Sequence, residues 1–160
     1  MAQILMSNIP IQPHLNRERQ RAPKGDEFSM KKTISGTCTT THWLQQGYNL
    51  EHGIKLSVAE KESTFIGGIE GKSIVRYTTV NMKDGTRTFT GYIRITGRIG
   101  DREGSFVVED TGRGNTEQTN GTWKILADAA TGDLVGIKGE GGWKWEKGNK
   151  HEEYTLTYEF

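Results

Sequence analysis

The chain has 160 residues, of which 21 are Lys or Arg and 20 are Asp or Glu, and its formal net charge at pH 7 is +1. This balance gives no long-range field to attract a polyanion, so we expect no nucleic-acid partner. The length predicts one domain with a hydrophobic core of its own. The single cysteine, Cys38, excludes an internal disulfide and is typical of a reducing compartment.

Residues 1–29 differ in composition from the rest of the chain. They contain all three prolines and a cluster of alternating charges at residues 17–21. We expect an extended or partly disordered tail here, and a single domain over residues 30–160. The start of the chain lacks the basic region of a signal peptide, and no run approaches the roughly 18 apolar residues of a membrane span. We therefore expect a cytoplasmic protein without a membrane partner.

From residue 31 onward, glycines interrupt short runs of β-branched and aromatic residues. Glycines as frequent as those of residues 132–142 are incompatible with a helix, because each costs about 1 kcal/mol relative to alanine. In a strand, the same glycines permit sharp bends and close approach of neighbouring strands. The expected strands cover residues 33–43, 56–66, 69–82, 86–99, 105–111, 117–126, 134–143 and 152–160.

The connections between these strands carry turn signals. Asp84-Gly85 predicts a type I′ hairpin turn, and Gly100-Asp101 predicts a second tight turn. Asn120-Gly121 indicates either a turn or a bulge. Residues 45–53 read as a polar loop, and residues 127–131 as one helical turn.

Eight strands in hairpin order predict an all-β fold, a single eight-stranded antiparallel up-and-down β-barrel. A sandwich of two sheets is the structural alternative, but it needs cleaner apolar alternation than this sequence has. In residues 86–99 one face is Phe89, Ile93 and Ile95, and the other holds Tyr92 and Arg94. Either face can line the interior, which then becomes an ordinary core or a polar cavity.

Several segments resemble a family of small bacterial barrels that is known only as a domain of unknown function. Four segments carry this resemblance: Thr96-Gly97-Arg98-Ile99-Gly100-Asp101-Arg102-Glu103-Gly104-Ser105-Phe106, Gly121-Thr122-Trp123, residues 132–142, and Tyr154-Thr155-Leu156-Thr157-Tyr158-Glu159-Phe160. Two shorter segments, Ile69-Glu70-Gly71 and Asp84-Gly85, fit the same family pattern. The resemblance covers roughly residues 31–160. It implies an eight-stranded barrel similar to allene-oxide-cyclase-like and calycin barrels, often oligomeric, and no established reaction.

The sequence departs from this family pattern at two positions. Ile93 stands where relatives often carry an acidic residue before the arginine of the fourth strand, and Asp110 stands where they often carry a histidine. An acid–base role that depends on that pair is not expected here.

Carboxylates on different strands can converge inside a barrel, where burial raises their pKa toward a catalytic range. The candidates are Glu140, Glu109, Glu70 and Asp110. Glu140 and Glu109 are the preferred catalytic carboxylates. Glu140 is favoured because its flanking glycines leave space beside it, although they can equally serve to bend the strand. For each of these residues a solvated outward position is the competing interpretation.

Arg94 is the candidate for orienting a substrate, since an arginine in mid-strand can bind a carboxylate in a fork. Four aromatic side chains, with Glu70, are the candidate ligand-binding residues: Tyr92, Trp123, Tyr77 and Tyr154. Placement of Arg94 and Arg76 on the outer surface, and of the aromatic residues in the core, is the alternative.

The four histidines lack the spacing of metal ligands, and the glycine-rich segments precede strands rather than helices. We therefore expect no metal and no cofactor. Cys38 has no neighbouring base in the sequence and is expected to be a small buried thiol.

Two functions remain open from the sequence. One is a cofactor-independent cyclase or isomerase that folds a small apolar or amphipathic substrate inside the barrel, by analogy with allene-oxide-cyclase-like proteins. The other is a barrel that binds a small ligand without catalysis. A buried carboxylate facing an aromatic wall favours the enzyme. In both cases the partners are a small molecule and further copies of the chain.

Overall fold

The computed structural model describes residues 29–160, and every regular element in that range is a β-strand. The predicted tail, residues 1–29, lies outside the described residues except for Ser29, whose hydroxyl donates a hydrogen bond to the carbonyl of Phe160 (2.7 Å). The strands are β1 (Lys32–Glu51), β2 (Ile54–Gly67), β3 (Glu70–Asn81), β4 (Arg87–Ile99), β5 (Arg102–Gly114), β6 (Gln118–Gly132), β7 (Lys138–Glu146) and β8 (Glu152–Glu159).

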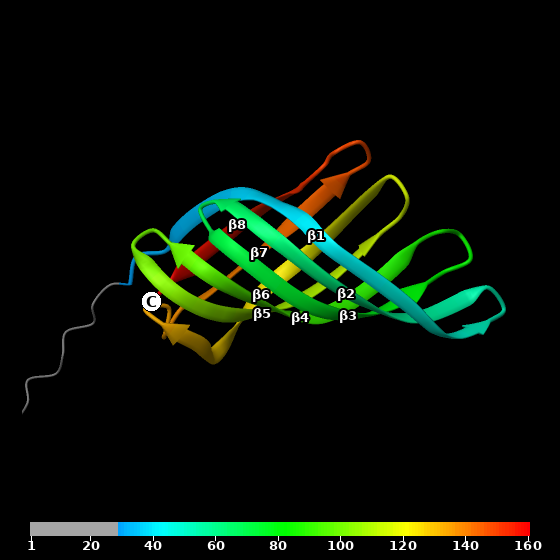
Figure 1. Cartoon of the computed structure of the whole chain (residues 1–160), viewed down its shortest axis with the longest axis horizontal. Helices are drawn as coiled ribbons and strands as arrows, with labels where there is room; N and C mark the ends of the chain where they lie inside the picture. The colour runs from blue at the N-terminus through cyan, green and yellow to red at the C-terminus, as the bar shows by residue number, and fades with distance from the viewer. Residues whose placement is uncertain (1–28) are drawn as a thin grey trace, which may run out of the picture.

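The strands form one closed ring (Figure 1). Each strand pairs antiparallel with the next, and β8 pairs with β1 through the register Lys32↔Tyr158 to Cys38↔Glu152. The expectation of eight antiparallel strands in hairpin order is confirmed, and the two-sheet alternative is excluded.

Alternation along each strand decides which face lies inside. On β4, Phe89, Ile93 and Ile95 are buried, while Tyr92 and Arg94 are exposed. The apolar face therefore lines the interior, as burial of apolar surface requires. Much of the interior is packed with side chains around an aromatic cluster of Phe65, Trp123 and Tyr154, with ring centroids 5.2–6.1 Å apart.

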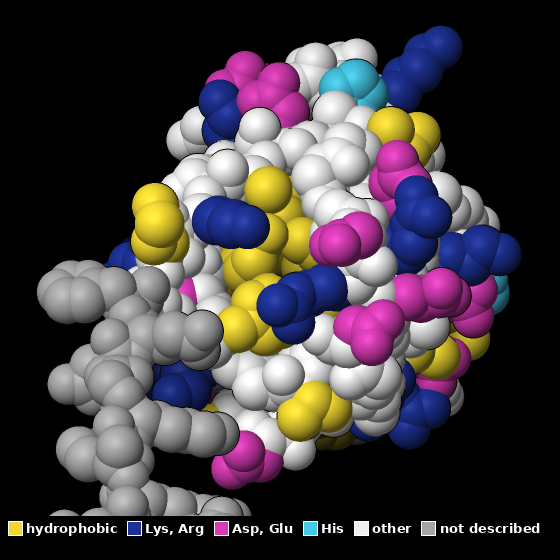
Figure 2. All heavy atoms as spheres, turned by 90° about the vertical axis from the view of Figure 1, so that its left-hand side faces the viewer, with side chains coloured by type: hydrophobic (Ala, Val, Ile, Leu, Met, Phe, Trp, Pro, Cys, Tyr) yellow, Lys and Arg dark blue, Asp and Glu magenta, His cyan; other side chains and the backbone are white. Residues whose placement is uncertain are grey.

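The two ends of the ring differ. The hairpins β1–β2, β3–β4, β5–β6 and β7–β8 all reach one end, on the right of Figure 1. The opposite end is filled by four buried side chains, Ile69, Ile99, Leu134 and Ile137. Figure 2 shows this end from outside, where apolar side chains gather at the centre among Lys and Arg side chains.

The wall of the ring is uneven in height at the hairpin end. β1 has 20 residues, yet only its first part, Lys32–Cys38, pairs with β8. The rest of β1 continues alongside β2 up to Glu51↔Ile54. Because β8 is only 8 residues long, the β1–β2 hairpin overhangs the β7–β8 side. This difference in height leaves the hairpin end of the interior open.

Two segments that were expected to be irregular are strand. Residues 45–51 continue β1, so the loop predicted for residues 45–53 shrinks to a turn at His52-Gly53. Residues 127–131 lie in β6, where the register with β5 shifts between Phe106 and Val108 and Asp128 has a positive φ of 60°. The prediction of one helical turn at residues 127–131 is therefore wrong: these residues belong to a strand in which a bulge holds extra residues.

Turns lie where they are predicted at Asp84-Gly85 and Gly100-Asp101, but the prediction of a turn or bulge at Asn120-Gly121 is wrong. At Asp84-Gly85 only Gly85 has a positive φ, 85°, and Gly85 N donates to the Met82 carbonyl at 3.2 Å. This is a three-residue loop, a type I turn followed by a left-handed glycine, rather than type I′. Asn120-Gly121 forms neither a turn nor a bulge, because both residues pair regularly within β6.

Candidate functional site

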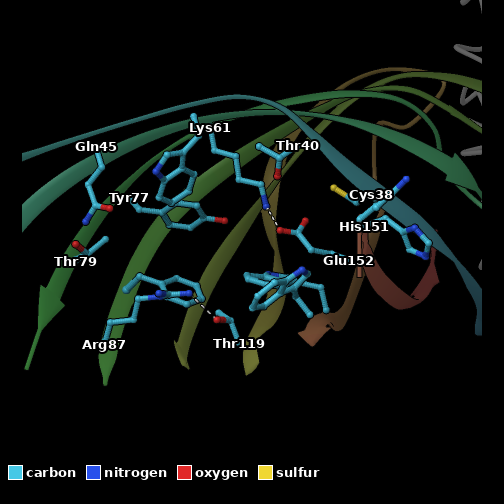
Figure 3. Close-up of a pocket in the computed structure, with 15 residues that line it drawn as sticks. Cys38, Thr40, Gln45, Lys61, Tyr77, Thr79, Arg87, Thr119, His151 and Glu152 are labelled. Carbon is cyan, nitrogen blue, oxygen red and sulfur yellow. Dashed lines mark hydrogen bonds and ion pairs between the residues drawn. The ribbon is translucent and has the colours of Figure 1, made fainter. Parts of the chain in front are cut away.

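The open end of the barrel contains a cup with a volume of about 480 Å³ (Figure 3). Its size lies within the range of pockets that hold small organic ligands, roughly 300–1,000 Å³. Side chains from seven strands and the β7–β8 loop line it: Cys38, Thr40, Trp43, Gln45, Lys61, Tyr77, Thr79, Arg87, Phe89, Thr119, Trp143, Trp145, Lys150, His151 and Glu152.

An ion pair forms part of the floor of the cup. The Lys61 ammonium on β2 contacts the Glu152 carboxylate on β8, and the side chains are 8% and 14% exposed. Lys61 Nζ also lies 5.0 Å from the centroid of a Trp143 ring, where the ring face attracts the positive charge. Below this pair a space of only about 10 Å³ remains before the packed core. The pair therefore marks the depth to which a ligand can enter.

Aromatic rings build the wall of the cup. Phe89 and Trp143 are stacked, with centroids 5.7 Å apart, and Tyr77 meets Phe89 edge to face at 5.1 Å. Trp145 lies two residues beyond Trp143 on the same face of β7. Trp43 projects from the overhanging part of β1 and is 51% exposed, so it stands at the rim. Such flat, rigid walls suit a ligand with an aromatic or apolar body.

A buried carboxyl group fixes two of these aromatic residues from behind. Asp110 is fully buried, and its Oδ2 accepts hydrogen bonds from the Tyr77 hydroxyl (2.7 Å) and from Trp143 Nε1 (2.9 Å). Burial raises the pKa of the Asp110 carboxyl above its usual range, while the donors Tyr77 and Trp143 act in the opposite direction. Burial, and then the charge of Asp110, raise the pKa of Tyr77 well above its usual value. Tyr77 therefore stays a neutral donor to Asp110.

Polar side chains line the other side of the cup. Gln45 Nε2 donates to Ser57 Oγ (2.8 Å), and Ser57 in turn hydrogen bonds to Thr79. On the neighbouring strand β4, Arg87 Nη2 donates to Thr119 Oγ1 (2.7 Å), as Figure 3 shows. The cup thus offers an aromatic wall, a hydroxyl-bearing wall and an oriented guanidinium.

Cys38 lies in the wall of the cup but is not activated. Burial, and then the charge of Glu152, raise the pKa of its thiol to about 12. A thiol in this state is a weak nucleophile at neutral pH. Within residues 29–160, no three His, Cys, Asp or Glu side chains gather in a way that could hold a metal ion.

The three residues predicted to be catalytic face away from the cup. Glu140 and Glu109 belong to an outward row of paired residues that also contains Tyr92 and Lys124. Arg94 is exposed on the same outer surface. The apolar face of each strand takes the interior, so these charged residues take the solvent side. A role inside the barrel does not fit their positions.

The space beside Glu140 has another explanation. A Cβ atom on either flanking glycine, Gly139 or Gly141, would collide with a backbone carbonyl of β8. These glycines allow β7 and β8 to approach, so the alternative interpretation of the glycine pattern applies.

The predicted ligand-binding residues divide between the two faces. Tyr77 lines the cup, whereas Trp123 and Tyr154 are buried in the packed core below it. Tyr92 is 59% exposed, and Glu70 forms an exposed ion pair with Arg98.

Sequence reasoning missed most of the cup. Lys61 lies between Glu60 and Glu62, and Glu152 precedes Glu153. Only the three-dimensional path of the chain distinguishes Lys61 and Glu152 from these charged neighbours. Trp143 and Trp145 carried a usable signal, because tryptophans two residues apart share one face of a strand. Trp43, on β1, shares no such spacing with another tryptophan.

Comparison with known proteins places this geometry in a family. Residues 34–158, which extend from β1 into β8, match the family model described as "Protein of unknown function (DUF3224)". The chain belongs to the DUF3224 family. No curated protein matches the chain.

A DUF3224 protein from Shewanella oneidensis MR-1, of unknown function, has a similar structure. It is 19% identical in sequence, the match covers 81% of this chain and 96% of that chain, and the TM-score is 0.65. At this identity the similarity shows a shared fold. The expected resemblance to a bacterial family of unknown function is thereby confirmed. No helix within residues 29–160 of this DUF3224 protein is long and apolar enough to cross a membrane.

Proposed function

We propose that this protein binds a small, largely apolar or amphipathic molecule in the cup at the hairpin end. The observation that carries the proposal is the cup itself, a space of about 480 Å³ bounded by Phe89, Trp143 and Trp145 and floored by the Lys61–Glu152 pair. Pockets with apolar walls and a few convergent polar groups are the usual form of small-molecule sites.

The test blocks the cup without touching the core. Thr40 lines the cup and is exposed, so Thr40→Trp should fill it. Thr39→Trp is the matched control, because its side chain projects from the opposite face of β1. A panel of apolar and amphipathic compounds is screened by native mass spectrometry and by thermal stabilisation.

We expect compounds that bind the wild type and Thr39→Trp but not Thr40→Trp. The proposal is overturned if no compound binds the wild type, or if Thr40→Trp binds as well as the wild type does.

A second candidate is a cofactor-independent isomerase or cyclase of the allene-oxide-cyclase-like kind. The observation in its favour is a carboxylate next to an ammonium group at the floor of the cup, in Glu152 and Lys61. Asp110 also meets the condition of a buried carboxyl against an aromatic wall, but it sits behind that wall, where it positions Tyr77 and Trp143.

In this reading Glu152 removes a proton from the carbon next to a substrate carbonyl, and the electron pair moves onto the carbonyl oxygen. The Lys61 ammonium stabilises the resulting enolate. In a substrate whose carbon–carbon double bond is conjugated with this enolate, the proton then returns from Glu152 to the far carbon of that double bond, and the double bond shifts toward the carbonyl. No further reactant is needed.

The probe is 2-tetralone, a cyclic ketone fused to a benzene ring, with exchangeable protons next to its carbonyl; it is incubated with the protein in D₂O and followed by NMR. Exchange faster with the wild type than with Glu152→Gln supports catalysis. Equal rates for the two proteins contradict it.

A further inference from the structure

We propose that the ligand of the cup is an aromatic organic anion, with its ring system in the cup and its acidic group at the rim on Arg87. This inference rests on the proposed binding function and names the chemical class of the ligand. Three features of the cup carry it: its charge, the position of that charge, and the nature of its wall.

The cup is a positive spot on a nearly neutral molecule. Its lining contains three cationic side chains, Lys61, Arg87 and Lys150, and one carboxylate, Glu152. Glu152 is already engaged by Lys61. Arg87 and Lys150 therefore give the site a net positive charge, although the whole chain carries only +1.

Arg87 is placed to receive an anion. Thr119 Oγ1 binds one of its terminal nitrogens at 2.7 Å and so orients the guanidinium over the cup. Among residues 29–160, no carboxylate lies within 4.0 Å of it, unlike Arg76 and Arg98, which pair with Glu60 and Glu70. The remaining N–H groups of a guanidinium match the two oxygens of a carboxylate or sulfonate.

The charged groups and the aromatic rings occupy different depths. Arg87 is half-buried, and Lys150 and Trp43 are exposed at the rim. Tyr77, Phe89 and the Lys61–Glu152 pair lie deeper. A ligand with a flat apolar body deep in the cup and an acidic group at the rim matches both depths. The deep part needs no charged ligand group, because Lys61 and Glu152 already neutralise each other.

The wall favours rings over alkyl chains. Of the four tryptophans of the chain, three line the cup, together with Phe89 and Tyr77. Flat rings gain from offset or edge-to-face contact with such walls beyond the area that they bury. A flexible alkyl chain also loses more conformational entropy when it is confined.

The test compares two fluorescent probes that share one aromatic framework. 8-Anilinonaphthalene-1-sulfonate is anionic, and N-phenyl-1-naphthylamine is the same molecule without the sulfonate. We expect the full-length protein to bind both probes at one site, with the anion at least tenfold tighter at low salt. We expect added NaCl to weaken binding of the anion only.

Substitution separates the roles of charge and ring. Arg87→Gln should reduce affinity for the anionic probe about tenfold and leave the neutral probe unchanged, whereas Arg87→Lys should restore part of the loss. Arg98→Gln is the control, since Arg98 also lies on β4 but at the closed end of the barrel. Retained binding of the neutral probe shows that each variant is folded.

Competition tests the aromatic requirement, with 1-naphthoate and decanoate each displacing the bound anionic probe. Stronger displacement by 1-naphthoate supports the inference, and equal or stronger displacement by decanoate overturns the aromatic part. Equal affinity for the two fluorescent probes, or an unchanged anion affinity in Arg87→Gln, overturns the role of charge. If neither probe binds the wild type, the proposed binding function itself fails.

Discussion

Asp110 connects the buried core to the wall of the cup through hydrogen bonds to one of its carboxyl oxygens. Its Oδ2 receives one hydrogen bond from a β3 tyrosine and one from a β7 tryptophan, and its carboxyl is fully buried. Burial opposes ionisation, so the pKa of this carboxyl in the folded state lies above its value in the unfolded chain. Its influence on stability therefore depends on pH.

We predict that the wild type loses stability relative to Asp110→Asn as pH rises from about 4 through the raised pKa of Asp110. Below this window the carboxyl is protonated in both states. Within it, the unfolded chain releases the proton more readily, so unfolding is favoured. Urea unfolding of both proteins between pH 4 and pH 8 measures the difference, in which the other titrating groups cancel. A difference that stays constant or moves in the opposite direction contradicts the raised pKa.

Gly121 leaves the space in which Asp110 and Trp143 form their hydrogen bond. A Cβ atom at this position would collide with Asp110 Oδ1 and Trp143 Nε1. We predict that Gly121→Ala lowers the free energy of unfolding by about 1–3 kcal/mol, the usual cost of overpacking. Gly47→Ala is the control, because a Cβ there meets mainly the flexible side chain of Lys55, and it should change stability by less than about 0.5 kcal/mol. Equal effects in chemical denaturation would show that Gly121 has no special role.

At the scale of the elements, the closure between β1 and β8 is short and carries a buried ion pair. Lys61 on β2 and Glu152 on β8 meet across β1, where only Lys32–Cys38 pair with β8. Removing one partner of a nearly buried ion pair leaves the other charge buried without a counter-charge. The resulting loss in the free energy of unfolding is larger than the net stabilisation that the intact pair provides.

We predict that Lys61→Met and Glu152→Gln each destabilise the protein by about 3 kcal/mol, and that the double variant costs clearly less than the sum of the two. Guanidinium unfolding of all four members of the cycle measures the coupling. Additive effects would mean that the two charges do not interact in solution.

The sequence predicted the strands well and the cup poorly, for a physical reason. Strand identity depends on local signals, such as the alternation of Phe89, Ile93 and Ile95 and the turn at Gly100-Asp101, and these can be read along the chain. The cup depends on the unequal lengths of β1 and β8 and on register shifts in β1, between Thr40 and His42 and between Gly47 and Asn49. Carboxylates such as Glu140 and Glu109 look equivalent to Glu152 in sequence, and only the closed ring separates the outer from the inner ones.

At the scale of the whole molecule, closure of the ring gives the barrel two different ends: one is filled by the hydrophobic core, and the hairpin end holds the cup. Closure removes the sheet edges over the paired length of the ring, and the packed cluster of Phe65, Trp123 and Tyr154 holds the strands in register. The tryptophans divide along the same line, with Trp123 in the core and Trp43, Trp143 and Trp145 in the cup.

This division provides the most direct test of the account, because each tryptophan gives its own indole N–H signal in a nitrogen-15 NMR spectrum. Titration with 1-naphthoate should shift the signals of Trp43, Trp143 and Trp145 progressively and leave that of Trp123 in place, with tryptophan-to-phenylalanine variants supplying the assignments. Shifts confined to Trp123, shifts of similar size in all four signals, or no shift at saturating ligand would contradict a binding cup at the hairpin end.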